Sequence, residues 1–322
     1  MKIELVNHAK YRAPGRQGDD VPLILPGVVF GIFDGATDAH GTVMDGIGMG
    51  RVAALTVAQA TAALLLDPAA RRLPLAKIIA YLSNALSARC APLSVPIAPS
   101  TTVALAIDCG DVWRFITLGD TGIRLNGTEV LFHEKIIDAV STHARVALFQ
   151  HFATTMDDPD TIEAATRRGI LLGLDNAVAE QHLTAAQMDD IIGKAAKSNG
   201  LDHAIDDVRA FLRGGIRVQH KLANGTGNAL NFDSMNGTIP GLSEVVDEVR
   251  AKEDVHSIEI FTDGFPVRPR DISAAAWEQA FTAAEDSDFH KIGAFATVKG
   301  STSTEYFDDR TVLVLDRLTA AS

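Results

Sequence analysis

Three segments of this chain place an acidic residue at one end of a mainly apolar run, and in two of them a glycine follows the acid. Val28–Phe33 runs into Asp34-Gly35, and Ile258–Thr262 runs into Asp263-Gly264, while Asp308 stands shortly before the run Val312–Leu315. Each run is typical of a buried strand. If the three ends meet, their carboxylates repel one another unless a cation gathers them. Divalent cations prefer carboxylate oxygens, so the pattern predicts a divalent metal site.

Each acid also has an ordinary structural interpretation. Asp-Gly pairs are frequent in hairpin turns, so Asp34-Gly35 and Asp263-Gly264 could each close a hairpin. Asp120 could cap a turn through bonds to its own backbone. The neighbours Asp19 and Asp20 could be acids of a surface loop. We favour the metal site because both Asp-Gly pairs follow apolar strands and a third acid has a matching position.

The composition is that of an acidic globular protein. The 322 residues are 47% hydrophobic, which is enough for a large core, and the formal net charge is −12. Nucleic acids and anionic membranes require a basic face, so we expect neither as a partner. The two cysteines, Cys90 and Cys109, form no disulfide framework, and the first residues lack the apolar core of a signal peptide. We therefore expect a cytoplasmic protein.

The order of elements predicts two antiparallel sheets with helices outside them. Thr101–Ile107 and Val112–Leu118 flank a hairpin turn at Asp108–Asp111, and Asn126-Gly127 indicates a second hairpin. Helical composition marks residues 51–66, 75–88 and 273–285, and also the short segment 243–251. Together these pieces predict an α+β fold, a four-layer α/β/β/α sandwich of two antiparallel sheets flanked by helices.

Residues 133–215 differ from the rest of the chain because their composition is mainly helical. Few β-branched runs occur in Lys135–His151, Asp160–Leu172 and Ala185–Leu212, and strand-like residues return at Ile216–Leu222. No linker stands out, so we interpret residues 1–322 as a single domain with a helical insertion at 133–215. Long segments beside a site often select substrates, and we expect this one to border the metal site.

Five short motifs follow one another along the chain. They are GIFDG at Gly31–Gly35, PSTTV at Pro99–Val103, LGDTG at Leu118–Gly122, FTDGF at Phe261–Phe265 and DDRTV at Asp308–Val312. In this order they resemble motifs of the metal-dependent serine/threonine phosphatases of the 2C type. A weaker sixth, GDDV at Gly18–Val21, is similar to that family's N-E-D-A. Ala36 stands where eukaryotic members often have His, so the chain resembles a divergent bacterial member.

The resemblance implies a metal centre with two Mn²⁺ or Mg²⁺ ions and a further position for a third ion. The ligands that it implies are Asp20, Asp34, Gly35, Asp120, Asp263 and Asp308. Asp34 would bridge two ions, Asp263 and Asp308 would hold the second, and Asp120 would belong to a third, looser position. The implied reaction is hydrolysis of phosphoserine or phosphothreonine in a phosphorylated protein by a metal-activated water. No Cys or Ser nucleophile is then required.

A cationic side chain should also orient the phosphate ester opposite the metals. Lys10, Arg12 and Arg16 precede the acidic pair Asp19-Asp20, and a guanidinium can bind phosphate through two parallel hydrogen bonds. We favour Arg16 because it is closest to Asp20. The catalytic residues implied are then Asp34, Asp263 and Arg16.

Histidines and glycines suggest two further interpretations. The spacing of His40, His133, His143 and His151 matches no zinc motif. The glycines of Gly46–Gly50 precede a helix, as in a phosphate-binding loop, but the Lys of a P-loop is missing. We interpret these glycines as a connector that lets the helix pack closely on a sheet.

Three functions compete on this basis. The first is a metal-dependent protein serine/threonine phosphatase that acts in signalling. The second is a catalytically degenerate relative that binds a partner through the same fold. The third is a two-metal hydrolase of small phosphate esters, whose metal core would be the same as that of the first. The sequence favours the first because it retains Asp34, Asp263 and Asp308.

Overall fold

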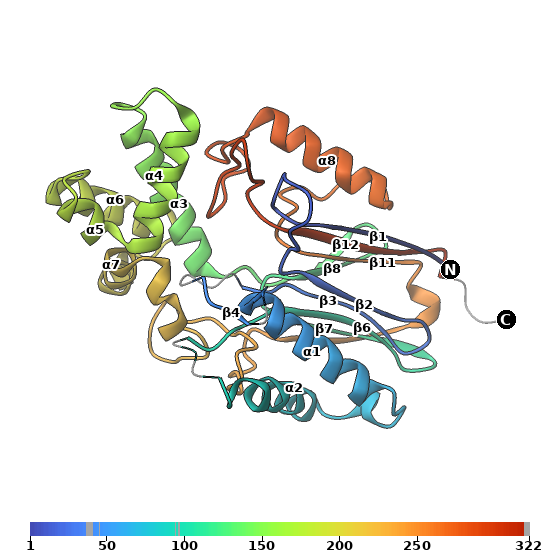
Figure 1. Cartoon of the computed structure of the whole chain (residues 1–322). Coiled ribbons are helices and arrows are strands. Elements are labelled where there is room, and N and C mark those ends of the chain that lie inside the picture. The colour runs from blue at the N-terminus through green and yellow to red at the C-terminus, as the bar shows by residue number, and fades with distance from the viewer. Residues whose placement is uncertain (37–40, 45, 94, 96, 319–322) are drawn as a thin grey trace. The chain divides into compact units, whose positions relative to one another are not determined.

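The computed structural model describes residues 1–36, 41–44, 46–93, 95 and 97–318 (Figure 1). The chain forms two compact units. The first consists of Met1–Glu134, Asp233–Thr282 and Asp309–Ser322, and the second of Lys135–Phe232 and Ala283–Asp308. That residues 1–322 form one domain with an insertion at 133–215 stays a prediction. Within the described ranges, no helix has both the length and the apolar composition that crossing a bilayer requires.

The first unit contains two five-stranded sheets in which neighbouring strands run antiparallel. One sheet has the order β1 (Lys2–His8), β12 (Arg310–Asp316), β11 (Ser257–Phe261), β8 (Gly122–Leu125) and β9 (Glu129–Leu131). The other has the order β10 (Val246–Ala251), β7 (Val112–Leu118), β6 (Val103–Asp108), β3 (Val29–Phe33) and β2 (Val21–Leu25). The predicted antiparallel sheets are therefore confirmed.

Apolar side chains of both sheets meet in one core. Phe30 and Ile32 of β3 pack in the same cluster as Ile258 and Ile260 of β11. The alternate residues of β3, such as Phe33, belong to a second cluster on the opposite face. All five residues of β3 are buried, which explains why its sequence is continuously apolar instead of alternating.

Helices cover the outer faces of both sheets (Figure 1). α1 (Met49–Leu65) and α2 (Leu75–Cys90) share the second cluster with β3 and β6. On the other sheet, Trp277 of α8 (Ala274–Ser287) donates from Nε1 to Oε1 of Glu259 at 2.7 Å, and its ring lies 5.1 Å from that of Phe261. The predicted four-layer α/β/β/α sandwich is confirmed. Short elements complete the unit: β4 (Val43–Met44), β5 (Ile47–Gly48), η1 (Ala70–Arg72) and η4 (Lys252–Asp254).

Two local predictions were wrong. Residues 243–251 were expected to be helical, but Val246–Ala251 form strand β10, which pairs with β7 from Val246↔Thr117 to Ala251↔Val112. Pairing with a distant strand overrides a local helical preference. The expected strand at Ile216–Leu222 is instead the 3-10 helix η3 (Ile216–Lys221), which follows Gly215.

The second unit is helical. The segment 133–215 contains α3 (Ile136–Phe152), α4 (Pro159–Leu172), α5 (Leu174–Ala179), α6 (Ala185–Ser198), η2 (Asp202–Ala204) and α7 (Ile205–Gly214). These helices bury a core of their own, which includes Leu148, Ile192 and Phe211. Local signals set the helix starts, since the Asp158 side chain accepts from the Thr161 amide at 3.0 Å and Thr184 forms a capping box with Gln187.

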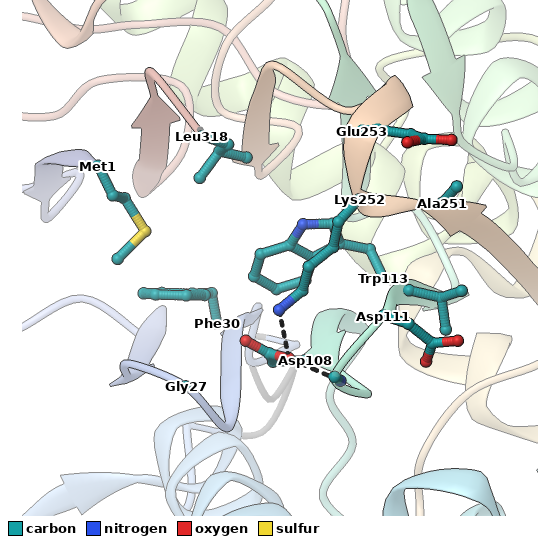
Figure 2. A pocket seen from close by; sticks show the side chains of 12 residues that line it. Met1, Gly27, Phe30, Asp108, Asp111, Trp113, Ala251, Lys252, Glu253 and Leu318 are labelled. Carbon is teal, nitrogen blue, oxygen red and sulfur yellow. Dashed lines mark hydrogen bonds and ion pairs between the residues drawn. The ribbon is translucent and has the colours of Figure 1, made fainter. Parts of the chain in front are cut away.

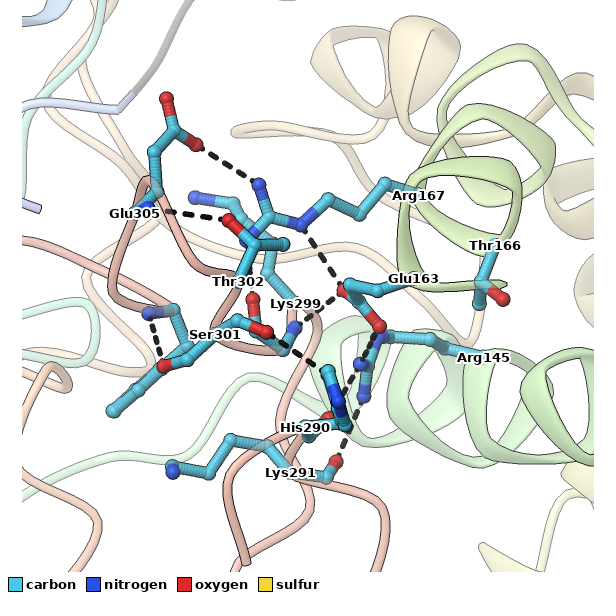
Figure 3. Close-up of polar contacts among 12 residues, drawn as sticks. Arg145, Glu163, Thr166, Arg167, His290, Lys291, Lys299, Ser301, Thr302 and Glu305 are labelled. Carbon is cyan, nitrogen blue, oxygen red and sulfur yellow. Dashed lines mark hydrogen bonds and ion pairs between the residues drawn. The ribbon is translucent and has the colours of Figure 1, made fainter. Parts of the chain in front are cut away.

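A buried network of charges fastens residues 288–305 to α3 and α4 (Figure 3). Arg145 is fully buried and donates to the carboxylate of Glu163, which is also fully buried, and to the carbonyl of Lys291. The amide of Gly300 donates to Glu163 at 2.7 Å. Burial lowers the pKa of the Arg145 guanidinium, and the charge of Glu163 opposes this shift. In this network each buried charge meets a group of opposite charge.

Candidate functional site

Two of the predicted acids lie next to each other at one end of the second sheet. Asp34 follows β3, and Asp20 precedes β2. The last residue of β3, Phe33, pairs with Val21, the first residue of β2. The register therefore sets Asp20 beside Asp34, with Asp20 only 2% exposed and Asp34 half-buried.

Two more predicted acids lie at one end of the other sheet. Gly122, the first residue of β8, pairs with Phe261, the last residue of β11. Asp120 and Asp263 each stand two residues beyond that pair, on the same side of it. Asp120 is buried and Asp263 is exposed.

Threonine hydroxyls join these two pairs of acids across the sandwich. Thr262, which precedes Asp263, donates its hydroxyl to Oδ2 of Asp20 at 3.0 Å. The amide of Thr102 donates to the carbonyl of Asp34 at 2.8 Å, and the hydroxyls of Thr102 and Thr121 are hydrogen-bonded to each other. Four of the predicted acids are thus brought to one end of the sandwich, which we call the acidic end: Asp20, Asp34, Asp120 and Asp263.

The glycines that follow two of these acids lie in close contact with other backbone. A Cβ at Gly35 would lie 2.4 Å from the carbonyl carbon of Gly50 and 2.9 Å from the carbonyl oxygen of Asp19. A Cβ at Gly264 would lie 1.9 Å from the carbonyl oxygen of Asp309. The glycines therefore allow three segments to meet closely at the acidic end. The contact of Gly50 with this backbone agrees with the interpretation of 46–50 as a close-packing connector.

The hairpin interpretation of the two Asp-Gly pairs is wrong. After Asp34-Gly35, the next strand that pairs with β3 is β6, which begins only at Val103. After Asp263-Gly264, the next strand is β12, which begins only at Arg310, with α8 in between, so neither pair closes a hairpin. Asp263-Gly264 does form a turn, in which the Phe265 amide donates to the Thr262 carbonyl at 3.4 Å. The true hairpins are those predicted at 108–111, between β6 and β7, and at Asn126-Gly127, where both residues have positive φ angles of 52° and 71°.

Lys10 forms an ion pair that the sequence did not indicate. Its Nζ lies 3.4 Å from Oδ2 of Asp309 and 3.7 Å from Oδ2 of Asp19, and its amide donates to Oδ1 of Asp309 at 2.6 Å. The amide of Asp19 donates to the same Asp309 carboxylate at 2.9 Å. Lys10 is 7% exposed, so it stabilises the fold of the loop and is not an available phosphate anchor.

Asp308 is the last residue of the second unit, and its carboxylate accepts from Nζ of Lys299 at 3.0 Å within that unit. Its convergence with Asp34 and Asp263 stays a prediction. Its neighbour Asp309 belongs to the first unit, where the Thr311 carbonyl accepts from the Thr262 amide at 3.0 Å.

A cavity of about 490 Å³ lies in the first unit beside Asp19. Arg16 lines it, with its guanidinium 3.5 Å from the centre of the Tyr11 ring. Arg12 is exposed and is not among the lining residues.

Arg51, which sequence reasoning missed, also lines the cavity and donates from Nη1 to the carbonyls of Gly18 and Asp20 at 2.7 and 3.1 Å. In the sequence, the one feature that could have pointed to Arg51 is its position at the start of a helix that follows a glycine-rich loop.

A larger cavity, of about 640 Å³, lies at the other end of the sandwich (Figure 2). Its charged lining residues are Asp108, Asp111, Lys252 and Glu253. Nζ of Lys252 lies 2.7 Å from Oδ1 of Asp108 and 5.2 Å from the centre of the Trp113 ring. Three acidic residues and one lysine, which is already paired with Asp108, line this cavity, so it is a poor site for a phosphate.

The two cysteines are not activated nucleophiles. Cys90 and Cys109 are free thiols, and burial raises the pKa of both, so neither is an activated thiolate. His40 lies outside the described residues. Within the described part of the chain, no three His, Cys, Asp or Glu side chains are arranged to hold one metal ion. The donors gathered at the acidic end are carboxylate oxygens, the type that Mg²⁺ and Mn²⁺ accept.

Comparison with known proteins finds similarity of structure only. No protein-family model matches the chain, and no curated protein matches it in sequence. Solved structures similar to it include the Mycobacterium tuberculosis serine/threonine phosphatase PstP/Ppp, at 15% identity and a TM-score of 0.45, with 98% of each chain covered. Staphylococcus aureus serine/threonine phosphatase Stp1 is 10% identical with a TM-score of 0.47, covering 97% of this chain and 93% of that one. PppA, a regulatory component of T6SS in Pseudomonas aeruginosa, is 12% identical with a TM-score of 0.41, covering 98% and 96%.

These values concern fold and carry nothing about activity. The proteins matched include serine/threonine phosphatases, the class that the five motifs resemble. In fold, this chain is similar to the 2C-type serine/threonine phosphatases of bacteria.

Proposed function

We propose that this protein is a metal-dependent serine/threonine phosphatase that hydrolyses phosphoserine or phosphothreonine in other proteins. The observation that carries the proposal is the acidic end of the sandwich, where strand register and threonine hydrogen bonds gather Asp20, Asp34, Asp120 and Asp263. Asp20 and Asp120 are buried, and burying carboxylates close to other acids costs free energy unless a cation binds them.

In the proposed mechanism, each acid of the site has a stated role in holding metal ions. Asp34, the Gly35 carbonyl, Asp263 and Asp308 would hold the divalent ions, and Asp20 and Asp120 would support them. The chemistry that divalent ions would supply there is activation of a water for hydrolysis of the phosphate ester. Thr262 restrains the Asp20 carboxylate through its hydroxyl at 3.0 Å, so that this ligand is oriented before any ion arrives.

Arg16 is the proposed anchor of the phosphate ester. It lines the cavity beside Asp19, and its guanidinium is stacked on Tyr11, which leaves its N–H edges to meet an anion. Arg16→Ala should raise KM for phosphate esters and leave Mn²⁺ affinity unchanged, whereas an unchanged KM would exclude this role.

Hydrolysis of an aryl phosphate and of a phosphothreonine peptide, with and without Mn²⁺ and with a chelator control, tests the proposal. We expect Asp34→Asn to lower kcat by about 100-fold or more while the protein stays folded. The matched control is Asp108→Asn at the opposite end, which should keep the parent rate. Turnover that survives chelation, or normal turnover by Asp34→Asn, would refute the mechanism.

Residues 133–215 are proposed to select the phosphoprotein. A variant with this segment shortened should lose activity on phosphoproteins far more than on the aryl phosphate. Equal losses on both would mean that the segment is simply part of the core.

A partner-binding protein without catalysis is the second candidate. Lys10 favours it, because its single ammonium already offsets part of the negative charge of Asp19 and Asp309 near the acidic end. That candidate predicts phosphopeptide binding without Mn²⁺-dependent hydrolysis, and hydrolysis that depends on Asp34 would eliminate it.

A further inference from the structure

The cavity beside Asp19 has cationic walls, which is unexpected in a chain with a net charge of −12. Among its described lining residues, the charged ones are Arg16, Asp19 and Arg51. Nζ of Lys10 lies 3.7 Å from Oδ2 of Asp19 and 3.4 Å from Oδ2 of Asp309, so the ammonium offsets part of the negative charge of Asp19. Two guanidinium groups therefore dominate the described walls, in contrast to the acidic cavity at the opposite end.

Arg51 is held in a fixed position. Its Nη1 donates to the carbonyls of Gly18 and Asp20, so one nitrogen ties the helix start to the acidic loop. Within the part of the chain that the structure describes, its Nε and Nη2 have no protein partner. The first turn of α1, which contains Arg51, has no acidic residue, so the backbone N–H groups there add to the positive potential. A guanidinium fixed in this way is preorganised for an anion.

The cavity is larger than a phosphate group needs. A volume of about 490 Å³ lies in the range of sites that accept a small molecule or several side-chain groups. In the proposed function Arg16 takes the phosphate ester, which leaves Arg51 for a second anion close to the first. A peptide supplies such an anion as the carboxylate of a neighbouring Asp or Glu, or as a second phosphate.

We infer that Arg51 binds an acidic group next to the phosphorylated residue, so that the protein prefers phosphoserine or phosphothreonine in an acidic sequence. The inference rests on the proposed function. Arg51 is then a residue for substrate selection and also positions Asp20 through the loop carbonyls. The two roles are separable, because only the first depends on the charge of the peptide.

A double-mutant cycle between protein and peptide tests the inference. Each pair of peptides carries one phosphothreonine, and its two members differ only at one position, which is Glu in one and Gln in the other. Separate pairs place this difference at each of the two positions before the phosphothreonine and each of the two positions after it. We expect the parent protein to favour Glu over Gln in kcat/KM by roughly fivefold at low salt for at least one position. In Arg51→Gln the ratio should fall below about twofold, whatever the absolute rate, because loss of the loop contacts affects both peptides equally.

Arg72→Gln is the matched control. Arg72 pairs with Asp111 at the opposite end, and its loss should leave the fivefold ratio unchanged. A parent without preference at any tested position, or an Arg51→Gln variant that keeps the full ratio, would overturn the inference.

Binding of the same peptides, measured by fluorescence anisotropy, separates this inference from the proposed function. Hydrolysis without a Glu preference would remove only the acidic subsite. A Glu preference in Kd without any Mn²⁺-dependent hydrolysis would support the subsite and refute the catalytic proposal.

Discussion

The two ends of the sandwich use aspartate in different ways. At the end that holds the 108–111 hairpin, Asp108 accepts from the Gly110 amide at 2.9 Å and from Lys252 at 2.7 Å, so a turn and a lysine stabilise it locally. At the acidic end, the acids come from strands of both sheets and meet through register and threonine hydroxyls. β3 separates the two ends by roughly 17 Å. An Asp that terminates a strand without closing a hairpin is therefore the better candidate for chemistry.

The largest expected effect comes from filling the close contact at Gly35. Gly35→Ala would force a Cβ to within 2.4 Å of the Gly50 backbone, and we expect the free energy of unfolding to fall by about 3 kcal/mol. Urea unfolding of the parent and the variant measures this change in the free energy of unfolding. The control is Gly193→Ala, since a Cβ on that helical glycine meets nothing within 4 Å and should stabilise the protein by about 0.5 kcal/mol. Equal effects at the two glycines would contradict the close packing at the acidic end.

Removing one buried charge at the acidic end should affect metal binding and not the fold. Asp20→Asn keeps an oxygen for the Thr262 hydroxyl and loses the negative charge. We expect the Mn²⁺ concentration for half-maximal activity to rise about tenfold or more. Circular dichroism should stay unchanged. An unaltered Mn²⁺ dependence would assign Asp20 to loop structure alone.

The same substitution at the opposite end should behave differently. Asp108→Asn removes the ion pair with Lys252 but keeps an acceptor for the Gly110 amide, so unfolding should become easier by about 1 kcal/mol. Mn²⁺ dependence should match the parent. If Asp108→Asn and Asp20→Asn changed Mn²⁺ dependence equally, the distinction between the two ends would fail.

The last expected effect, which becomes the smallest in acid, concerns a turn aspartate in the second unit. Asp288 accepts from the amides of Ile292, Gly293 and Phe295 at 2.9–3.0 Å. Burial opposes ionisation, but these hydrogen bonds lower the pKa of Asp288 overall. Its stabilisation is thus present above the unfolded-state pKa and is lost as the pH falls through the lower folded-state pKa. Asp288→Asn should cost about 1 kcal/mol at pH 7 and progressively less in acid, as measured by unfolding at several pH values.

Local patterns were enough to predict most of the sandwich. The hairpins at 108–111 and Asn126-Gly127 depend on residues within a few positions of each other, so the sequence indicates them directly. β10 was mistaken for a helix because what makes it a strand is β7, more than 120 residues earlier in the chain.

Local sequence patterns predicted only part of the candidate site. The strand ends at Asp34 and Asp263 are visible in the sequence as apolar runs that stop. The contacts of Lys10 and Arg51 are not, because Asp309 lies 299 residues from Lys10 and the carbonyls that Arg51 contacts lie 31 and 33 residues before it. Long-range ion pairs and hydrogen bonds leave no periodic pattern in a single sequence.

A calorimetric Mn²⁺ titration of the parent, Asp34→Asn and Asp108→Asn tests most directly whether the acidic end is a metal site. The account predicts that the parent binds two Mn²⁺ ions per chain, that Asp34→Asn loses this binding and is more stable than the parent without metal, and that Asp108→Asn binds as the parent does. A parent that binds no Mn²⁺, or an Asp34→Asn variant whose titration matches the parent, would contradict it.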